Sequence, residues 1–225
     1  MFCKRLLLIA GLFLTACGAT TPTASPGSIT VEYTFAAAPF LATLDNCAGS
    51  NAVNEDLRSA DYLEYPTVDL AIRIGQPEDL PYPAYQIGTE DILVIANRQN
   101  PVSSLTGKQV RDLFTGQIQN WKELEGADAP VQVWVFPAGD DIQQIFDQNA
   151  LGGSPFTSMA RLANSPDEMS LAIANDVNAV GILSRHWKAG NVSDVYTISN
   201  IPVLAITPAQ PSAILAGIIA CLKNR

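Results

Sequence analysis

The segment from Ile92 to Trp121 constrains the fold of this 225-residue chain more than any other. Residues 92–96 are apolar and mostly β-branched, which is typical of a strand covered on both faces. Pro101 disfavours helix at the residue before it, so the chain bends there. Thr106 is a candidate N-cap and Gly116 a candidate C′ residue of a short amphipathic helix. The segment therefore predicts a buried strand, a bend and a helix, in that order.

Strands and helices alternate along the rest of the chain, which indicates an α/β fold with mostly parallel sheets. The pattern alone leaves open whether the chain forms one doubly wound domain or two lobes. Further strands are expected at 29–33, 68–74, 131–136, 179–183 and 203–206, and helices at 34–45, 53–63, 142–148, 167–175 and 212–222.

The N-terminus reads as a targeting segment. Residues 1–16 combine a positively charged start with an apolar run at 6–14 that is too short to span a bilayer. Small residues then precede Cys17, which predicts cleavage before Cys17 and attachment of lipid to its sulfur. The alternative is an ordinary secretory signal with an incidental cysteine. Residues 17–28 are rich in Thr, Ser, Pro and Gly and predict a tether.

Composition excludes some partners. The chain is 48% hydrophobic, as a globular protein is, and holds 22 acidic residues. Removal of residues 1–16 takes Lys4 and Arg5 away, which leaves 11 basic residues and a net charge of −11. Such a surface opposes binding to nucleic acid and basic docking on anionic lipid. We expect no nucleic-acid partner, and contact with the membrane only through the lipid anchor.

Two cysteines remain in the folded part. Cys47 and Cys221 lie near its two ends. A secretory signal directs the chain out of the cytoplasm and into an oxidising environment, in which disulfides form. We expect the two cysteines to form one disulfide that fixes both ends in the same lobe. The alternative is a pair of buried free thiols.

A family resemblance begins at Asn100-Pro101-Val102. Eight residues after it fit one ordered motif: Leu105, Thr106, Gln109, Asp112, Phe114, Gly116, Asn120 and Trp121. The segment resembles the extracytoplasmic solute-binding proteins related to the phosphate-binding protein of ABC transporters, within the type II periplasmic-binding-protein superfamily. Residues 169–183 are similar to the helix and strand that precede the family's return crossover. The resemblance covers most of 66–225 and is weak over 29–65.

The resemblance implies a two-lobed fold in which the chain crosses twice between lobes. Residues 29–97 with 201–225 would form lobe I, and residues 98–200 lobe II. The function implied is capture of a small, phosphate-like solute by hinge closure and its delivery to the membrane permease of an ABC transporter. The protein would lie in the periplasm or on the outer face of the membrane. No cofactor is implied.

Two other functions stay open. A sensor or interaction lipoprotein could use the same fold with a lost or changed ligand. An enzyme on this fold is disfavoured because no nucleophile–base constellation, metal-ligand spacing or phosphate-binding glycine loop is found, so neither catalytic nor metal residues are expected. His186 is the only histidine, and we expect it to be structural or solvated.

The resemblance places three loops at the cleft. The first follows the first strand, where relatives carry Gly, Ser and Thr residues; here it holds Thr34, Phe35 and Ala36. Only Thr34 offers a side-chain hydroxyl. The segment could equally be an apolar helix start packed in the core.

The second loop holds Gly139, Asp140 and Asp141 where relatives have Gly-Ser-Gly-Thr. Acidic residues cap helix starts well. They also oppose a bound phosphate, by about 4 kcal/mol per charge pair at 4 Å and an effective dielectric near 20. The two aspartates are therefore either helix caps or contacts to a cationic, hydroxylated or metal-bound ligand.

The third loop begins at Arg73, at the end of the expected strand 68–74. A guanidinium binds oxyanions well, which makes Arg73 the candidate cation of the cleft. The alternative is a solvated arginine, or one paired with Asp69 or Glu90.

Overall fold

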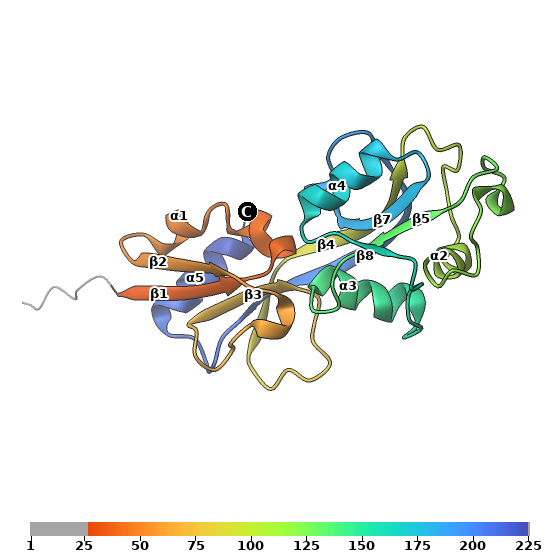
Figure 1. Ribbon diagram of the computed structural model, residues 1–225. Helices are drawn as coiled ribbons and strands as arrows, with labels where there is room; N and C mark the ends of the chain where they lie inside the picture. The colour runs from red at the N-terminus through yellow and green to blue at the C-terminus, as the bar shows by residue number, and fades with distance from the viewer. Residues whose placement is uncertain (1–26, 225) are drawn as a thin grey trace, which may run out of the picture.

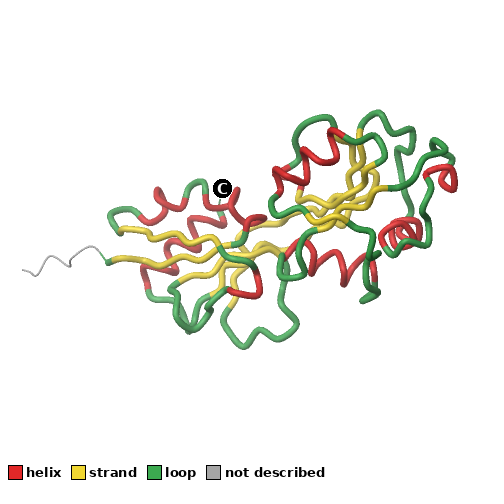
Figure 2. Tube along the Cα trace, viewed as in Figure 1, coloured by secondary structure: helices red, strands yellow, loops and turns green. Residues whose placement is uncertain are grey.

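The computed structural model describes residues 27–224 of the chain, which form two lobes arranged end to end (Figures 1 and 2). The signal segment and the lipid site at Cys17 lie outside these residues. One sheet of eight strands runs through both lobes in the order β2-β1-β3-β8-β4-β7-β5-β6. The strands are β1 (Ser28–Tyr33), β2 (Ala52–Leu57), β3 (Leu70–Ile74), β4 (Ala84–Asn97), β5 (Gln132–Val135), β6 (Arg161–Leu162), β7 (Ala179–Ser184) and β8 (Val192–Ile206).

Helices cover the sheet in each lobe (Figure 1). The α-helices are α1 (Leu44–Ala48), α2 (Gly107–Phe114), α3 (Asp141–Phe146), α4 (Pro166–Asn175) and α5 (Ala213–Lys223). Four short 3-10 helices are η1 (Phe35–Leu41), η2 (Ala60–Tyr62), η3 (Trp121–Leu124) and η5 (Arg185–Trp187), and η4 (Asp147–Leu151) is a π-helical turn. We call the part with β1–β3, α1 and α5 the first lobe, and the part with β5–β7 and α2–α4 the second lobe. No helix among residues 27–224 is long and apolar enough to cross a membrane.

The two lobes are joined by the long strands β4 and β8. Within the lobes, β1 pairs in parallel with β2 and β3, and β5 with β6 and β7. The strands β4 and β8 pair with each other and with β7 and β3 in antiparallel fashion. The predicted two-lobed α/β fold is confirmed, and its parallel portions are fused into one sheet by this antiparallel pair.

The chain passes between the lobes as strands. The register of β4 against β8 shifts between Glu90 and Ile92, and Asn200 on β8 has a positive φ of 62°. Such irregularities bend and twist a strand pair. The crossing therefore has a defined backbone geometry, while the division at Asn97 and residues 199–202 stays a prediction.

One hydrophobic core extends from the first lobe into the second. Every residue of β3 and β7 is buried, as their mostly apolar sequences predict, and this includes the polar Arg73 and Ser184. The helix expected after Thr106 is present, and Thr106 and Gln109 form a reciprocal capping box. Gly116 follows it with φ 78°, and a Cβ there would lie 2.9 Å from Thr157 Oγ1. The local signals of this segment thus agree with its tertiary packing.

Two expected helices are different in the structure. The helix expected at 53–63 is wrong: this stretch holds β2, the edge strand, and the single turn η2. Its position is set by parallel pairing with β1 and not by a buried face of its own, since its residues are mostly exposed. The helix expected at 34–45 is divided into η1 and α1, with Pro39 inside η1. Proline has no backbone N–H to donate, which disfavours a continuous helix.

The predicted disulfide is present. Cys47 of α1 and Cys221 of α5 are bonded, with their Cα atoms 5.7 Å apart and 174 positions apart in the sequence. The bond attaches the C-terminal helix to a helix near the start of the first lobe. Cross-linking residues so distant in sequence restricts the unfolded chain.

Candidate functional site

A cavity of about 230 Å³ lies where the two lobes face each other. The first lobe contributes the segment after β1 and the loop between β2 and η2, and the second contributes the loop before α3. Three of the predicted residues, Thr34, Phe35 and Asp140, meet here. The full lining is Thr34, Phe35, Leu57, Arg58, Ser59, Ala60, Pro137, Asp140 and Asn164. The cavity is thus bordered by residues that are far apart in the sequence and belong to both lobes.

Thr34 and Asp141 join the lobes beside this cavity. Thr34 follows β1 and is buried, and its hydroxyl donates a hydrogen bond of 2.5 Å to Asp141 Oδ2. The backbone N–H of Ile74 donates to the same oxygen at 3.0 Å. The other carboxylate oxygen, Oδ1, is buried without a hydrogen-bond partner. Burial raises the pKa of Asp141, against the opposing effects of the Thr34 hydrogen bond and the charge of Arg73.

Asp140 caps α3 and borders the cavity. Its Oδ1 accepts a hydrogen bond of 2.8 Å from the backbone N–H of Ile142, as an N-cap residue does. Burial, followed by the negative charge of Asp141, raises the pKa of Asp140 to about 8. At neutral pH a group with this pKa is mostly a neutral acid, so it can donate a hydrogen bond and repels an anion less than a carboxylate does.

Gly139 lets the lobes approach each other closely. Its carbonyl oxygen accepts a hydrogen bond of 2.6 Å from the Ser59 hydroxyl across the cleft. A Cβ at this position would lie 2.8 Å from Ser59 Oγ and 3.0 Å from Asp61 Oδ2. A side chain at position 139 would therefore require the side chains of Ser59 and Asp61 to shift.

Arg73 does not line the cavity at Thr34. It is buried, with 4% of its surface exposed, and borders a neighbouring cavity of about 330 Å³. Its Nη2 donates to Gln144 Oε1 at 2.9 Å, and its Nε donates to the backbone carbonyl of Ile74 at 3.2 Å. The suggested pairings with Asp69 and Glu90 are wrong. Asp69 accepts hydrogen bonds from Thr30, and Glu90 contacts His186.

The remaining residues of the first loop serve packing. Ala36 is fully buried in the core. The carbonyl of Phe35 accepts a hydrogen bond of 3.1 Å from Trp187 Nε1 of the second lobe. Phe35 therefore borders the cavity and also contributes to a contact between the lobes.

Sequence reasoning missed three polar residues of the lining. Arg58 pairs with Glu32 at 3.2 Å and with Asp56 at 2.7 Å, and Ser59 follows it directly. Both lie in the stretch expected to be a helix, where no local signal marks a site. Asn164 precedes α4 and enters the cavity only because the lobes come together.

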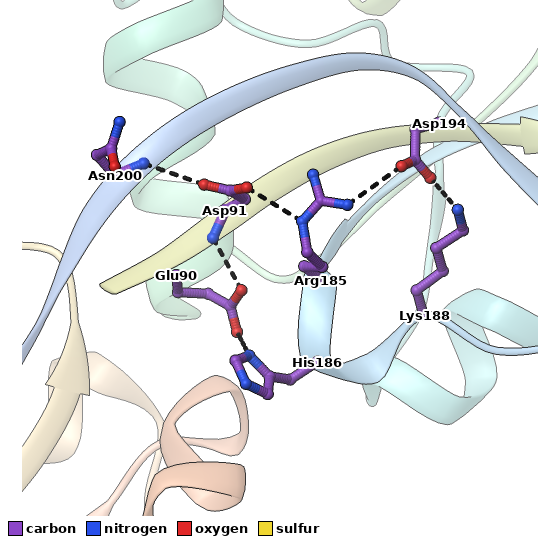
Figure 3. Close-up of polar contacts among 7 residues, drawn as sticks. All are labelled: Glu90, Asp91, Arg185, His186, Lys188, Asp194 and Asn200. Carbon is purple, nitrogen blue, oxygen red and sulfur yellow. Dashed lines mark hydrogen bonds and ion pairs between the residues drawn. The ribbon is translucent and has the colours of Figure 1, made fainter. Parts of the chain in front are cut away.

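A cluster of charged residues surrounds the crossing of β4 and β8 (Figure 3). Arg185 lies between Asp91, at 3.0 Å, and Asp194, at 3.4 Å, and Lys188 pairs with Asp194 at 2.5 Å. We call Asp91, Arg185, Lys188 and Asp194 the crossing cluster. Asp91 also accepts a hydrogen bond from the backbone N–H of Asn200, the residue with positive φ. The cluster thus contacts β4, β8 and the turn after β7.

The His186 side chain is 48% exposed and makes two specific contacts. Its Nδ1 lies 2.5 Å from Glu90 Oε2, and the Glu90 side chain is 1% exposed. Its ring packs edge-on against Phe40 of the first lobe, with centroids 4.9 Å apart. The histidine therefore connects η5 with both β4 and η1.

Comparison with known proteins agrees with this architecture. A family model described as a PBP superfamily domain matches residues 76–218. A stretch of 38 residues is 45% identical to the phosphate-binding protein PstS 2 of Streptococcus agalactiae. This stretch covers 17% of the present chain and 13% of that relative's length.

Solved structures share the fold over nearly the whole chain. A phosphate ABC transporter substrate-binding protein from Clostridium perfringens, with bound phosphate, superposes with a TM-score of 0.75 at 18% identity, over 86% of this chain and 92% of the other. The CcmR regulatory domain of Synechocystis, in complex with 2-PG, gives 0.62 at 16% identity, over 88% and 96%. At these identities the likeness extends to the fold alone, and the fold occurs in transport components and in a regulatory domain.

Proposed function

Because this chain belongs to the PBP superfamily, we propose that it is an extracytoplasmic solute-binding protein that takes a small solute into the cavity between its lobes. The observation that carries the proposal is the cavity of about 230 Å³ lined by residues of both lobes. A solute bound there would contact both lobes at once and would favour their closed arrangement.

We further propose that the solute is delivered to the membrane permease of an ABC transporter. The named relatives that bind phosphate support this role, and a binding protein needs neither catalytic residues nor a cofactor. Cys17 would carry the lipid anchor, and residues 17–28 would form the tether between membrane and folded part. Replacing Cys17 with Ser should then release the protein from the membrane fraction, whereas retention of the Cys17→Ser protein there would contradict lipid anchoring at this residue.

The ligand-binding residues remain a proposal. Thr34, Phe35 and Asp140 border the cavity, whereas Asp141, Gly139 and Arg73 fix the elements around it. Lobe I would comprise residues 29–97 and 201–225, and lobe II residues 98–200. The polar groups that face the cavity, from Arg58, Ser59, Asp140 and Asn164, favour a small solute with several hydrogen-bonding groups.

Thermal unfolding in the presence of single solutes tests the proposal. Phosphate, sulfate, molybdate, amino acids, polyamines and sugars form the panel. A solute at about 100 times its Kd should add roughly 2.7 kcal/mol to the free energy of unfolding and raise Tm. Solute capture would be contradicted if the folded protein showed no shift with any solute of the panel.

A sensor or interaction lipoprotein on the same fold is the second candidate. The structural likeness to the CcmR regulatory domain favours it, as do the direct hydrogen bonds that already connect the lobes. This candidate predicts that the protein is compact and equally stable with and without every solute of the panel.

A further inference from the structure

The buried carboxylate of Asp141 is the most unusual group of the cleft. Asp141 belongs to the second lobe, at the start of α3, which lies beside the end of β3 (Figure 1). Its side chain has no exposure to solvent, and it receives two hydrogen bonds from the first lobe. A carboxylate is costly to bury unless the surroundings supply donors or positive charge.

The first lobe supplies both hydrogen-bond donors and a positive charge to Asp141. The Thr34 hydroxyl and the Ile74 N–H converge on one carboxylate oxygen at 2.5 Å and 3.0 Å. Burial raises the pKa of Asp141 on balance, and the buried guanidinium of Arg73, one residue before Ile74, partly offsets this penalty on the charged form. A hydroxyl, a backbone N–H and a guanidinium are the groups that proteins use to hold oxyanions and carboxylates. The first lobe therefore presents a small anion receptor, and a side chain of the second lobe fills it.

Two neighbours of Asp141 dock on the same surface. The Gly139 carbonyl accepts from the Ser59 hydroxyl at 2.6 Å. Gln144, one turn after Asp141, accepts from Arg73 at 2.9 Å and donates to Asp61 at 2.7 Å. The segment 139–144 thus attaches to the first lobe at three successive points, with Asp141 in the middle and most buried.

We propose that Asp141 is a tethered ligand: its carboxylate fills an anion position of the first lobe and holds the two lobes together without a bound solute. This inference rests on the proposed function, because it assigns the cleft as the place of solute capture. It follows that free inorganic phosphate cannot enter this position in the native protein. A transported solute must use the adjacent cavity bordered by Asp140.

Chemical rescue tests this inference. In Asp141→Ala, the donors of the first lobe lose their partner, and the truncated side chain leaves room for a small anion. We expect a lower Tm for this variant and a rise in Tm with millimolar formate or inorganic phosphate. The native protein should not respond to formate beyond the general effect of a salt of equal ionic strength, because Asp141 fills the position; a native response to phosphate alone would report the adjacent cavity. Absence of rescue in the folded variant, or an equal specific response of the native protein to formate, would overturn the inference.

Two further variants keep the test decisive. Asp140→Ala removes the adjacent acidic group, whose hydrogen bond goes to the Ile142 N–H of its own helix and not to the donors of the first lobe, so its loss of stability should not be rescued by formate. If Asp141→Ala does not fold, Thr34→Val weakens the same bridge without emptying the position. Small-angle X-ray scattering should then show a larger radius of gyration for Thr34→Val than for the native protein, both without solute. An unchanged radius would contradict the tethered ligand.

The test of Asp141 as a tethered ligand and the test of solute capture can succeed or fail independently. Rescue of Asp141→Ala requires only formate or phosphate and the anion position, whereas solute capture is measured on the native protein with the whole panel. Rescue together with a native protein that binds no solute would retain the tethered ligand and remove solute capture. If phosphate specifically stabilises the native protein and neither anion rescues Asp141→Ala, solute capture is retained and the tethered ligand is removed.

Discussion

The cleft between the lobes and the crossing cluster on the strands that join them differ in burial and in charge. In the cleft, the bridge from Thr34 and Ile74 to Asp141 is buried and has a single carboxylate at its centre. In the crossing cluster, each charged group keeps part of its surface in solvent: Arg185 is 46% exposed, and Asp91 28%. Removing one partner of a buried polar contact leaves the other unsatisfied, whereas water replaces a lost partner at the surface. The cleft should therefore determine how stable the closed arrangement is, and the crossing cluster should mainly orient the strands.

The largest expected effect is the dependence of stability on pH, and it comes from the cleft. Asp140 has a pKa raised to about 8, and Asp141 a raised pKa, both chiefly because of burial. The folded state then binds more protons than the unfolded state, in which an aspartate titrates near 3.8. The stabilisation from these groups should thus be complete below pH 3.8 and be lost, by several kcal/mol, as pH rises from there to about 8. Urea unfolding at a series of pH values measures this slope.

Asp140→Asn is the matched control for that slope. Asparagine caps a helix about as well as aspartate but does not titrate, so the variant should keep α3 and flatten the fall of stability with pH. A stability that rises between pH 5 and pH 8 would contradict the raised pKa values and with them the buried nature of the cleft.

The next largest effect is expected for Thr34→Val. The substitution preserves the shape of the side chain but removes the hydroxyl that donates to Asp141. It leaves a buried carboxylate oxygen with one donor fewer, which should cost about 2 kcal/mol of unfolding free energy. Urea unfolding of both proteins at pH 7 provides the measurement. Thr30→Val is the matched control, because Thr30 also donates its hydroxyl to an aspartate, Asp69, but at an exposed site. Equal losses in the two variants would show that burial does not set the cost.

The same contrast explains what the sequence could predict. The helix after Thr106 was found because its cap, its apolar spacing and Gly116 are local signals. The edge strand β2 was missed because its side chains are mostly exposed and its position depends on pairing with β1. Its polar sequence shows no alternation, so the sequence predicts a helix where the structure has a strand.

As with the fold, local sequence signals predict some positions of the site, whereas the contacts of its residues depend on tertiary packing. The sequence places Thr34, Asp140 and Asp141 near the cleft because they follow a strand or open a helix, positions that approach the cleft in an open α/β fold, and their part in ligand binding stays a prediction. Their roles were not predictable, since whether an aspartate faces a cavity or the opposite lobe depends on how the lobes close. Arg58, Ser59 and Asn164 likewise enter the lining through tertiary packing, and no local pattern marks them.

The smallest effect is expected in the crossing cluster. Arg185→Ala removes the ion pairs to Asp91 and Asp194, yet Lys188 continues to neutralise Asp194 and water can solvate Asp91. The loss of unfolding free energy should therefore stay below about 1 kcal/mol and shrink further as salt screens the charges. Urea unfolding at low and high salt gives both quantities, and Lys188→Ala should behave in the same way. If Arg185→Ala cost more than Thr34→Val and kept that cost at high salt, the crossing and not the cleft would control how firmly the lobes are joined.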